Sequence, residues 1–128
     1  MFKKSLLKPW LFLLVSFLAI GLQAQTALNP GDISITGFRS DSDDGFSFVT
    51  WVDLTNGTEI RFTDNGWLAA SGFVTSENDM SWTNTTGSTI LAGTVIVVTC
   101  PSGSSSANLG TTSSQLDGLS SSGDQIFA

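Results

Sequence analysis

Apolar and polar residues alternate with a period of two along much of the chain between residues 32 and 100. Four segments carry this pattern most clearly, and they are residues 32–38, 46–54, 58–63 and 79–83. A period of two places alternate side chains on opposite faces, as in a half-buried β-strand. The pattern therefore predicts an all-β protein built from antiparallel strands.

Turn residues and one apolar run extend this prediction. Asn56-Gly57 is a strong signal for a tight turn, so we expect residues 46–54 and 58–63 to pair as one hairpin. Residues 94–100 form a continuous, mostly β-branched run, which is typical of a strand buried on both faces. Pro101 ends that run. The core expected from these strands consists of Ile33, Ile35, Phe46, Phe48, Val52, Ile60, Phe62, Val95 and Val97.

The C-terminal part has a different composition. Fifteen of the 22 residues from 102 to 123 are Ser, Gly or Thr, but three leucines interrupt them: Leu109, Leu116 and Leu119. A pure linker lacks such residues, so we expect a long loop that the leucines hold on the core. Residues 124–128 begin another strand pattern. We therefore expect a β-sandwich domain over residues 25–128, truncated at its C-terminal end within a longer protein.

The first 24 residues have the three parts of an export signal. Lys3, Lys4 and Lys8 precede a thirteen-residue apolar run over residues 10–22, and a small residue, Ala24, follows. Thirteen helical residues span about 20 Å, which is short of the roughly 30 Å hydrocarbon core. We expect a cleavable signal helix with cleavage near Ala24, and a product that is secreted or displayed on the cell surface without membrane insertion.

Charge and composition exclude several functions. The chain has no His and one Cys, and its only lysines lie in the export segment. Catalytic mechanisms that use a His base or a Lys Schiff base therefore lack their residues. Residues 25–128 carry two arginines and eleven carboxylates, a formal charge of −9. Nucleic acid is consequently not an expected partner, because its binding needs many cationic side chains.

A resemblance to a known module lies in the sequences and the order of five segments. They are residues 31–38 (GDISITGF), 46–49 (FSFV), 56–67 (NGTEIRFTDNGW), 91–94 (LAGT) and 119–127 (LSSSGDQIF). In this order they resemble a module near the N-terminus of large bacterial secreted and surface proteins, many of them similar to type IX secretion clients. The resemblance implies an immunoglobulin-like, lamin-tail-like antiparallel β-sandwich followed by downstream domains of the same polypeptide. No C-terminal sorting domain is present in this sequence.

Two loops contain candidate ligand-binding residues. Asp41, Asp43 and Asp44 lie within four residues, and a hard cation such as Ca²⁺ would relieve their mutual repulsion. The alternative is a solvated acidic turn. In the second loop, Asp64 and Asn65 precede Trp67, whose ring could stack on a sugar. The alternative there is a turn in which Asp64 and Asn65 bond to the backbone and Trp67 folds onto the domain.

These observations favour a non-catalytic adhesion or interaction module of an exported protein, with an extracellular glycan or protein as its partner. Two alternatives stay open. The chain could be an accessory domain of a secreted hydrolase, such as a nuclease or phosphatase, whose catalytic part lies downstream. It could also be a structural spacer. Ca²⁺ is the one cofactor considered, and no catalytic residue is assigned.

Overall fold

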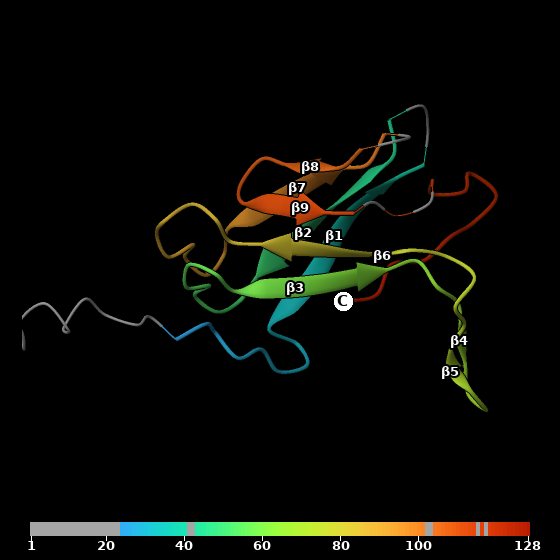
Figure 1. Ribbon diagram of the computed structural model, residues 1–128, viewed down its shortest axis with the longest axis horizontal. Coiled ribbons are helices and arrows are strands. Elements are labelled where there is room, and N and C mark those ends of the chain that lie inside the picture. Colours follow the sequence, from blue (N-terminus) through green and yellow to red (C-terminus); the bar gives the residue numbers. More distant parts are fainter. Residues whose placement is uncertain (1–23, 41–42, 102–103, 115, 117) are drawn as a thin grey trace, which may run out of the picture.

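The computed structural model describes residues 24–40, 43–101, 104–114, 116 and 118–128 (Figure 1). Within these ranges the chain forms β-strands and no helix, which confirms the all-β prediction. No helix in the described part is long and apolar enough to cross a membrane. Apart from Ala24, the expected signal segment lies outside the described residues. The strands are β1 (Ile33–Arg39), β2 (Gly45–Thr50), β3 (Glu59–Thr63), β4 (Trp67–Leu68), β5 (Gly72–Phe73), β6 (Asp79–Thr83), β7 (Val95–Thr99), β8 (Ser106–Ala107) and β9 (Thr111–Ser113).

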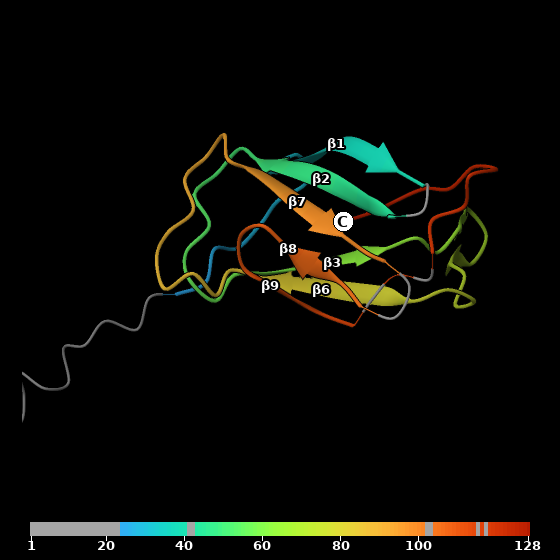
Figure 2. The same ribbon diagram turned by 90° about the horizontal axis from the view of Figure 1, so that it is seen from above.

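The described strands form two larger antiparallel sheets and one small one. The first sheet has the order β1-β2-β7-β8, and the second has the order β3-β6-β9. Strands β4 and β5 pair only with each other. In Figure 2, β1, β2 and β7 lie along one side of the molecule, and β3, β6 and β9 lie along the other.

One shared core lies between the two larger sheets. Most of its side chains come from β2 and β7 in one sheet and from β3 and β6 in the other. The Phe62 ring lies 4.8 Å from Phe46 and 5.0 Å from Phe48, and the Phe48 ring meets Trp82 edge-on at 5.4 Å. Aromatic contacts of this kind add to the large apolar area that each ring buries.

The predicted hairpin between residues 46–54 and 58–63 is wrong. β2 ends at Thr50 and pairs with β1 and β7, whereas β3 pairs with β6 in the other sheet. The Asn56-Gly57 turn does form: Thr58 N donates to Thr55 O at 3.1 Å, and Gly57 has a φ of 85°. Residues 51–58 carry the chain from one sheet to the other, so the turn signal was local and did not identify the partner strand.

The prediction that residues 94–100 are buried on both faces is also wrong. In β7, Ile96 and Val98 are buried, while Val95 and Val97 are 48% and 45% exposed. The expected core accordingly loses Val95, Val97 and Ile35, and Ile33 and Val52 are only partly buried. The physical reason is that a run of β-branched residues has no polar side to show which face meets solvent. Phe46, Phe48, Ile60 and Phe62 are in the core as expected.

The Ser-rich segment lies on the core, as predicted. Leu116 and Leu119 are buried, and Leu109 packs partly against them. This segment also contains β8 and β9, which pair with different sheets. The Trp82 indole N–H donates to Leu109 O at 2.7 Å, so the connection between β8 and β9 is attached to the second sheet.

Candidate binding surface beside the β4–β5 hairpin

The β4–β5 hairpin extends from the end of β3 and projects away from the two larger sheets (Figure 1). Trp67 pairs with Phe73, and Leu68 pairs with Gly72. Ser71 N donates to Leu68 O at 3.1 Å, and Gly72 has a φ of 81°. Glycine suits that turn position because a positive φ strains residues with a side chain. The hairpin therefore presents its side chains outside the main core.

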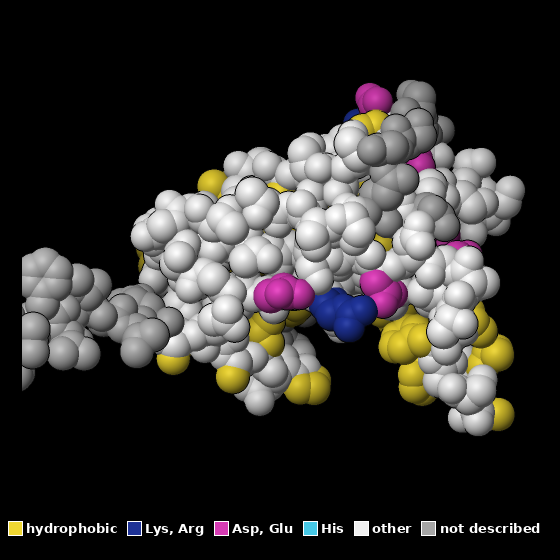
Figure 3. Space-filling model, viewed as in Figure 1, with side chains coloured by type: hydrophobic (Ala, Val, Ile, Leu, Met, Phe, Trp, Pro, Cys, Tyr) yellow, Lys and Arg dark blue, Asp and Glu magenta, His cyan; other side chains and the backbone are white. Residues whose placement is uncertain are grey.

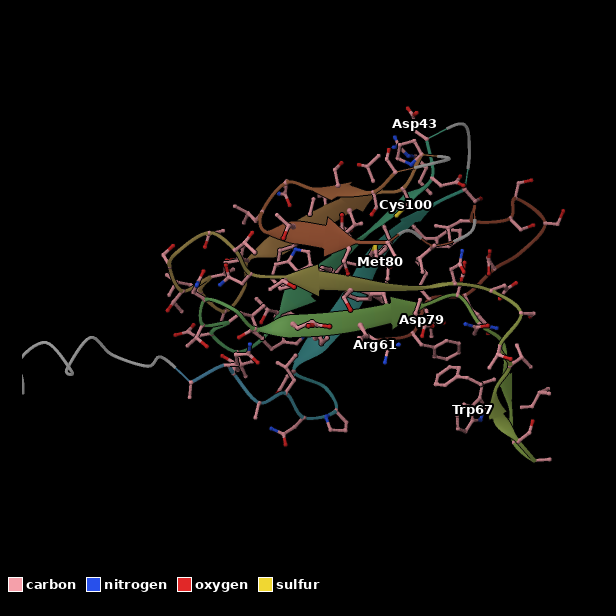
Figure 4. The ribbon with its side chains drawn as sticks, viewed as in Figure 1. Asp43, Arg61, Trp67, Asp79, Met80 and Cys100 are labelled. Carbon is pink, nitrogen blue, oxygen red and sulfur yellow. The ribbon has the colours of Figure 1, made fainter. Side chains whose placement is uncertain are left out.

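Three aromatic rings form a row from this hairpin to the C-terminal segment. The Trp67 and Phe73 ring centroids lie 4.9 Å apart, and those of Phe73 and Phe127 lie 5.1 Å apart, both edge-to-face. Trp67 is 56% exposed and Phe73 is 45% exposed. Figure 4 shows Trp67 on the hairpin, away from the body of the protein. These edge-to-face contacts restrain the rings, so the row presents an ordered apolar surface.

A cavity of about 450 Å³ lies beside this aromatic row, and both apolar and charged side chains line it. Phe73 and Phe127 line one part of it, and Arg61, Glu77 and Asp79 line another. The Arg61 guanidinium Nη2 lies 2.6 Å from Asp79 Oδ2, with the two side chains 70% and 45% exposed. An ion pair so exposed contributes little to stability. Figure 4 shows Arg61 and Asp79 close together. Figure 3 shows a basic side chain between acidic side chains on an open face, with hydrophobic side chains nearby.

The Asn65 side chain connects two chain segments beneath this surface. Its amide Nδ2 donates to Thr63 Oγ1 at 2.8 Å and to Glu77 O at 3.1 Å, and its Oδ1 accepts from Glu77 N at 3.0 Å. The Asn65 side chain is buried. These bonds join the end of β3 to the segment before β6, and they fix the part of the chain from which the hairpin projects.

The structure separates the three residues of the predicted ligand-binding loop. Trp67 is exposed on the hairpin, Asn65 lines the cavity from a buried position, and Asp64 is 1% exposed. Asp64 lines a different depression, together with Gly66, Ser76 and Asp124. Trp67 and Asn65 thus belong to one surface, whereas Asp64 faces another part of the protein.

The acidic loop is described only in part. Asp41 lies outside the described residues, Asp43 is exposed and Asp44 is half-buried. Asp44 O accepts a hydrogen bond from Cys100 N at 2.7 Å, so its backbone supports the fold. The described residues contain no group of three or more side chains placed to hold a metal ion. Calcium binding by this loop stays a prediction.

Sequence reasoning did not connect four of the residues that form the candidate surface: Arg61, Phe73, Asp79 and Phe127. Arg61 reaches across to Asp79 because β3 and β6 are adjacent strands. Phe127 arrives through a bridge to Thr63 from far along the chain. The only local signal was the aromatic character of two of the four, Phe73 and Phe127.

Comparison with known proteins adds no assignment, because no protein-family model, curated protein or solved structure matches this chain. The arguments about function therefore rest on the residues and their geometry.

Proposed function

We propose that this protein is a non-catalytic interaction module of an exported bacterial surface protein, and that the surface beside the β4–β5 hairpin binds an extracellular glycan. The observation that carries this proposal is the aromatic row of Trp67, Phe73 and Phe127, of which Trp67 and Phe73 are exposed, beside a cavity with charged groups. Ligand sites commonly combine aromatic walls with a few polar groups that fix orientation.

The chemistry of a sugar matches both parts of this surface. The C–H face of a pyranose ring is apolar and packs on an aromatic side chain. Its hydroxyl groups both donate and accept hydrogen bonds. The Asp79 and Glu77 carboxylates accept, and the Arg61 guanidinium donates. These side chains lie on the exposed face of β3 and β6 and on the segment before β6, where a ligand can reach them.

The finer architecture belongs to the same proposal. Two facing antiparallel sheets with one shared core support an immunoglobulin-like, lamin-tail-like β-sandwich. The basic and apolar segment at residues 3–24 supports export to the cell surface or the medium. In such a protein the module would lie next to downstream domains of the same polypeptide and would position them on a glycan.

A glycan array tests the binding proposal, with two tryptophan variants compared. Trp67→Ala removes the exposed end of the aromatic row. Trp51→Ala is the matched control, because Trp51 is also 56% exposed but hydrogen-bonds to Ser34 on β1. We expect the unaltered protein to bind a subset of glycans, Trp67→Ala to lose at least about tenfold in affinity, and Trp51→Ala to retain it.

Two results would contradict the proposal. If the unaltered protein binds no glycan on a broad array, the spacer interpretation is favoured. If Trp67→Ala and Trp51→Ala behave alike, any glycan binding resides elsewhere on the protein. Melting temperatures of the two variants should match that of the unaltered protein, since both side chains are largely exposed.

A further inference from the structure

The charged side chains of the cavity beside the aromatic row carry one negative charge in excess. Among the described residues that line it, Glu77 and Asp79 have carboxylates, and Arg61 has the one guanidinium. Arg61 Nη2 lies 2.6 Å from Asp79 Oδ2, and Asp79 Oδ1 accepts from Asn65 Nδ2 at 3.3 Å. Both oxygens of Asp79 therefore have partners, and the charge that Arg61 does not balance is that of Glu77.

Glu77 is well placed to contact a ligand. Its backbone N donates to Asn65 Oδ1 at 3.0 Å, and its backbone O accepts from Asn65 Nδ2 at 3.1 Å. The residue itself is exposed. Its side chain thus extends toward solvent from a restrained part of the chain, which lowers the entropic cost of ordering it around a ligand.

The rings of the same cavity also favour a positive charge. Phe73 and Phe127 line it, with their ring centroids 5.1 Å apart. The face of an aromatic ring attracts a cation that lies within about 6 Å of it. The rings and the unbalanced carboxylate therefore act in the same direction on a charged ligand.

The charge of the whole domain reinforces this preference. Residues 25–128 carry two arginines and eleven carboxylates, a formal charge of −9. A field of this sign raises the local concentration of cationic ligands and repels anionic ones. A glycan built from uronic acids consequently meets repulsion both at a distance and within the cavity.

We propose that this cavity selects glycans that carry a protonated amino sugar over neutral and acidic glycans. The apolar face of the sugar packs on the aromatic row, and the ammonium group donates charge-assisted hydrogen bonds to the Glu77 carboxylate. The inference rests on the proposed glycan binding and adds the class of sugar. An amino sugar carries its ammonium group directly on the ring, so one sugar unit meets the rings and the carboxylate together. The ammonium group of a lysine lies instead at the end of a flexible stem.

Four ligands test this selection by isothermal titration calorimetry, at low ionic strength and at a pH that protonates the sugar amines. They are tetramers of glucosamine, of N-acetylglucosamine and of glucuronic acid, and an oligolysine with as many positive charges as the first. The two glucosamine tetramers share one skeleton, and acetylation removes the positive charge.

Two variants of equal charge locate the selecting group. Glu77→Gln removes the proposed partner of the ammonium group. Glu59→Gln is the matched control, because Glu59 is also exposed but lies on β3 outside the lining of the cavity, where its Oε1 accepts from Ser81 Oγ at 2.7 Å. Both substitutions change the net charge by the same amount, so a difference between them reports the position of the carboxylate.

We expect the unaltered protein and Glu59→Gln to bind the glucosamine tetramer about fivefold more tightly than its N-acetylated form, and Glu77→Gln to bind the two alike. The glucuronic acid tetramer should bind more weakly than either. Equal or tighter binding of the N-acetylated tetramer would overturn the selection but leave glycan binding itself supported. Equal effects of the two substitutions, or oligolysine binding as tight as that of the glucosamine tetramer, would also overturn it. A protein that binds none of the three tetramers contradicts the inference, and the broad array then decides separately on glycan binding.

Discussion

Cys100 illustrates how the surroundings of one residue set its chemistry. Its side chain is buried, and burial is the main cause that raises its pKa from 9.0 to about 11. The carboxylates of Asp44 and Asp64 raise the pKa further, because a negative charge disfavours a nearby thiolate. The thiol is therefore a buried apolar group at neutral pH and not a reactive nucleophile.

The raised pKa of Cys100 predicts a loss of stability in alkaline solution. As pH rises above 9, the thiol ionises in the unfolded chain but stays protonated in the folded protein until about pH 11. The unfolded state then binds fewer protons, so the free energy of unfolding falls between pH 9 and 11, by up to about 2 kcal/mol. Urea denaturation at several pH values measures this fall.

Cys100→Ala is the control for the alkaline experiment, and it should remove the pH-dependent fall. The window is free of other side chains, since residues 25–128 contain neither Lys nor Tyr. An equal fall in the Cys100→Ala protein would show that another process causes it.

Calcium binding by Asp41, Asp43 and Asp44 predicts a higher melting temperature in excess Ca²⁺ than in chelator. A ligand that binds only the folded state stabilises it by about 2.7 kcal/mol at one hundred times its dissociation constant. In a domain of this size, that stabilisation raises the melting temperature by roughly 10 °C or more. Calorimetry measures the difference, and an Asp43→Asn, Asp44→Asn double variant should abolish it. Identical melting temperatures with Ca²⁺ and with chelator refute the calcium hypothesis.

At the scale of elements, β7 shows how burial depends on the neighbouring layer. The strand pairs with β2 on one edge and β8 on the other, so the position of each residue in the sheet is fixed. Its inner side chains, Ile96 and Val98, meet the second sheet, while Val95 and Val97 meet solvent. Two adjacent residues of similar apolar character therefore have very different energetic roles.

Alanine substitutions at adjacent positions of β7 test this difference. Ile96→Ala leaves a cavity in the shared core, and we expect it to lower the free energy of unfolding by about 2–5 kcal/mol. Val97→Ala removes atoms from an exposed face and should cost less than about 1 kcal/mol. Chemical denaturation compares the two proteins. Equal losses would mean that both faces of β7 are covered, as the sequence pattern first indicated.

At the scale of the whole molecule, the connection from β8 to β9 joins the two sheets. β8 pairs with β7 in the first sheet, and β9 pairs with β6 in the second. Gly110 lies in this connection with a φ of 76°, and a Cβ placed on it would collide with Thr83 O and lie 2.8 Å from Trp82 Nε1. The close approach of two backbone segments therefore depends on the absence of a side chain at residue 110.

Gly110→Ala should destabilise the protein more than Gly93→Ala does. Both glycines have a positive φ, which costs an alanine about 1–2 kcal/mol. A Cβ on Gly93 meets nothing within 4 Å, so only Gly110→Ala must also displace backbone. We expect an additional loss of about 1–3 kcal/mol for Gly110→Ala, measured by chemical denaturation. Equal losses would show that the connection adjusts without cost.

Only some residues of the candidate surface could be predicted from the sequence. Trp67 was identified because a tryptophan directly after a turn is conspicuous in the sequence, and the structure shows that it is exposed and that Asn65 lines the neighbouring cavity. Phe73, Asp79 and Phe127 could not be placed beside them, since their proximity depends on the β3–β6 pairing and on the bridge at Thr63. Spatial neighbours that are distant in sequence leave no local pattern.

The sequence by itself determined that the described chain is all-β, where β1, β3 and β6 lie, and that the Ser-rich segment packs through its leucines. Each of these follows from local alternation or from isolated apolar residues, which reveal which side chains leave water. The tertiary structure decided which strands pair, which face of β7 is buried and which side chains meet beside the hairpin. Those outcomes depend on the packing of one sheet against the other, and a turn signal or a uniform β-branched run is compatible with more than one such packing.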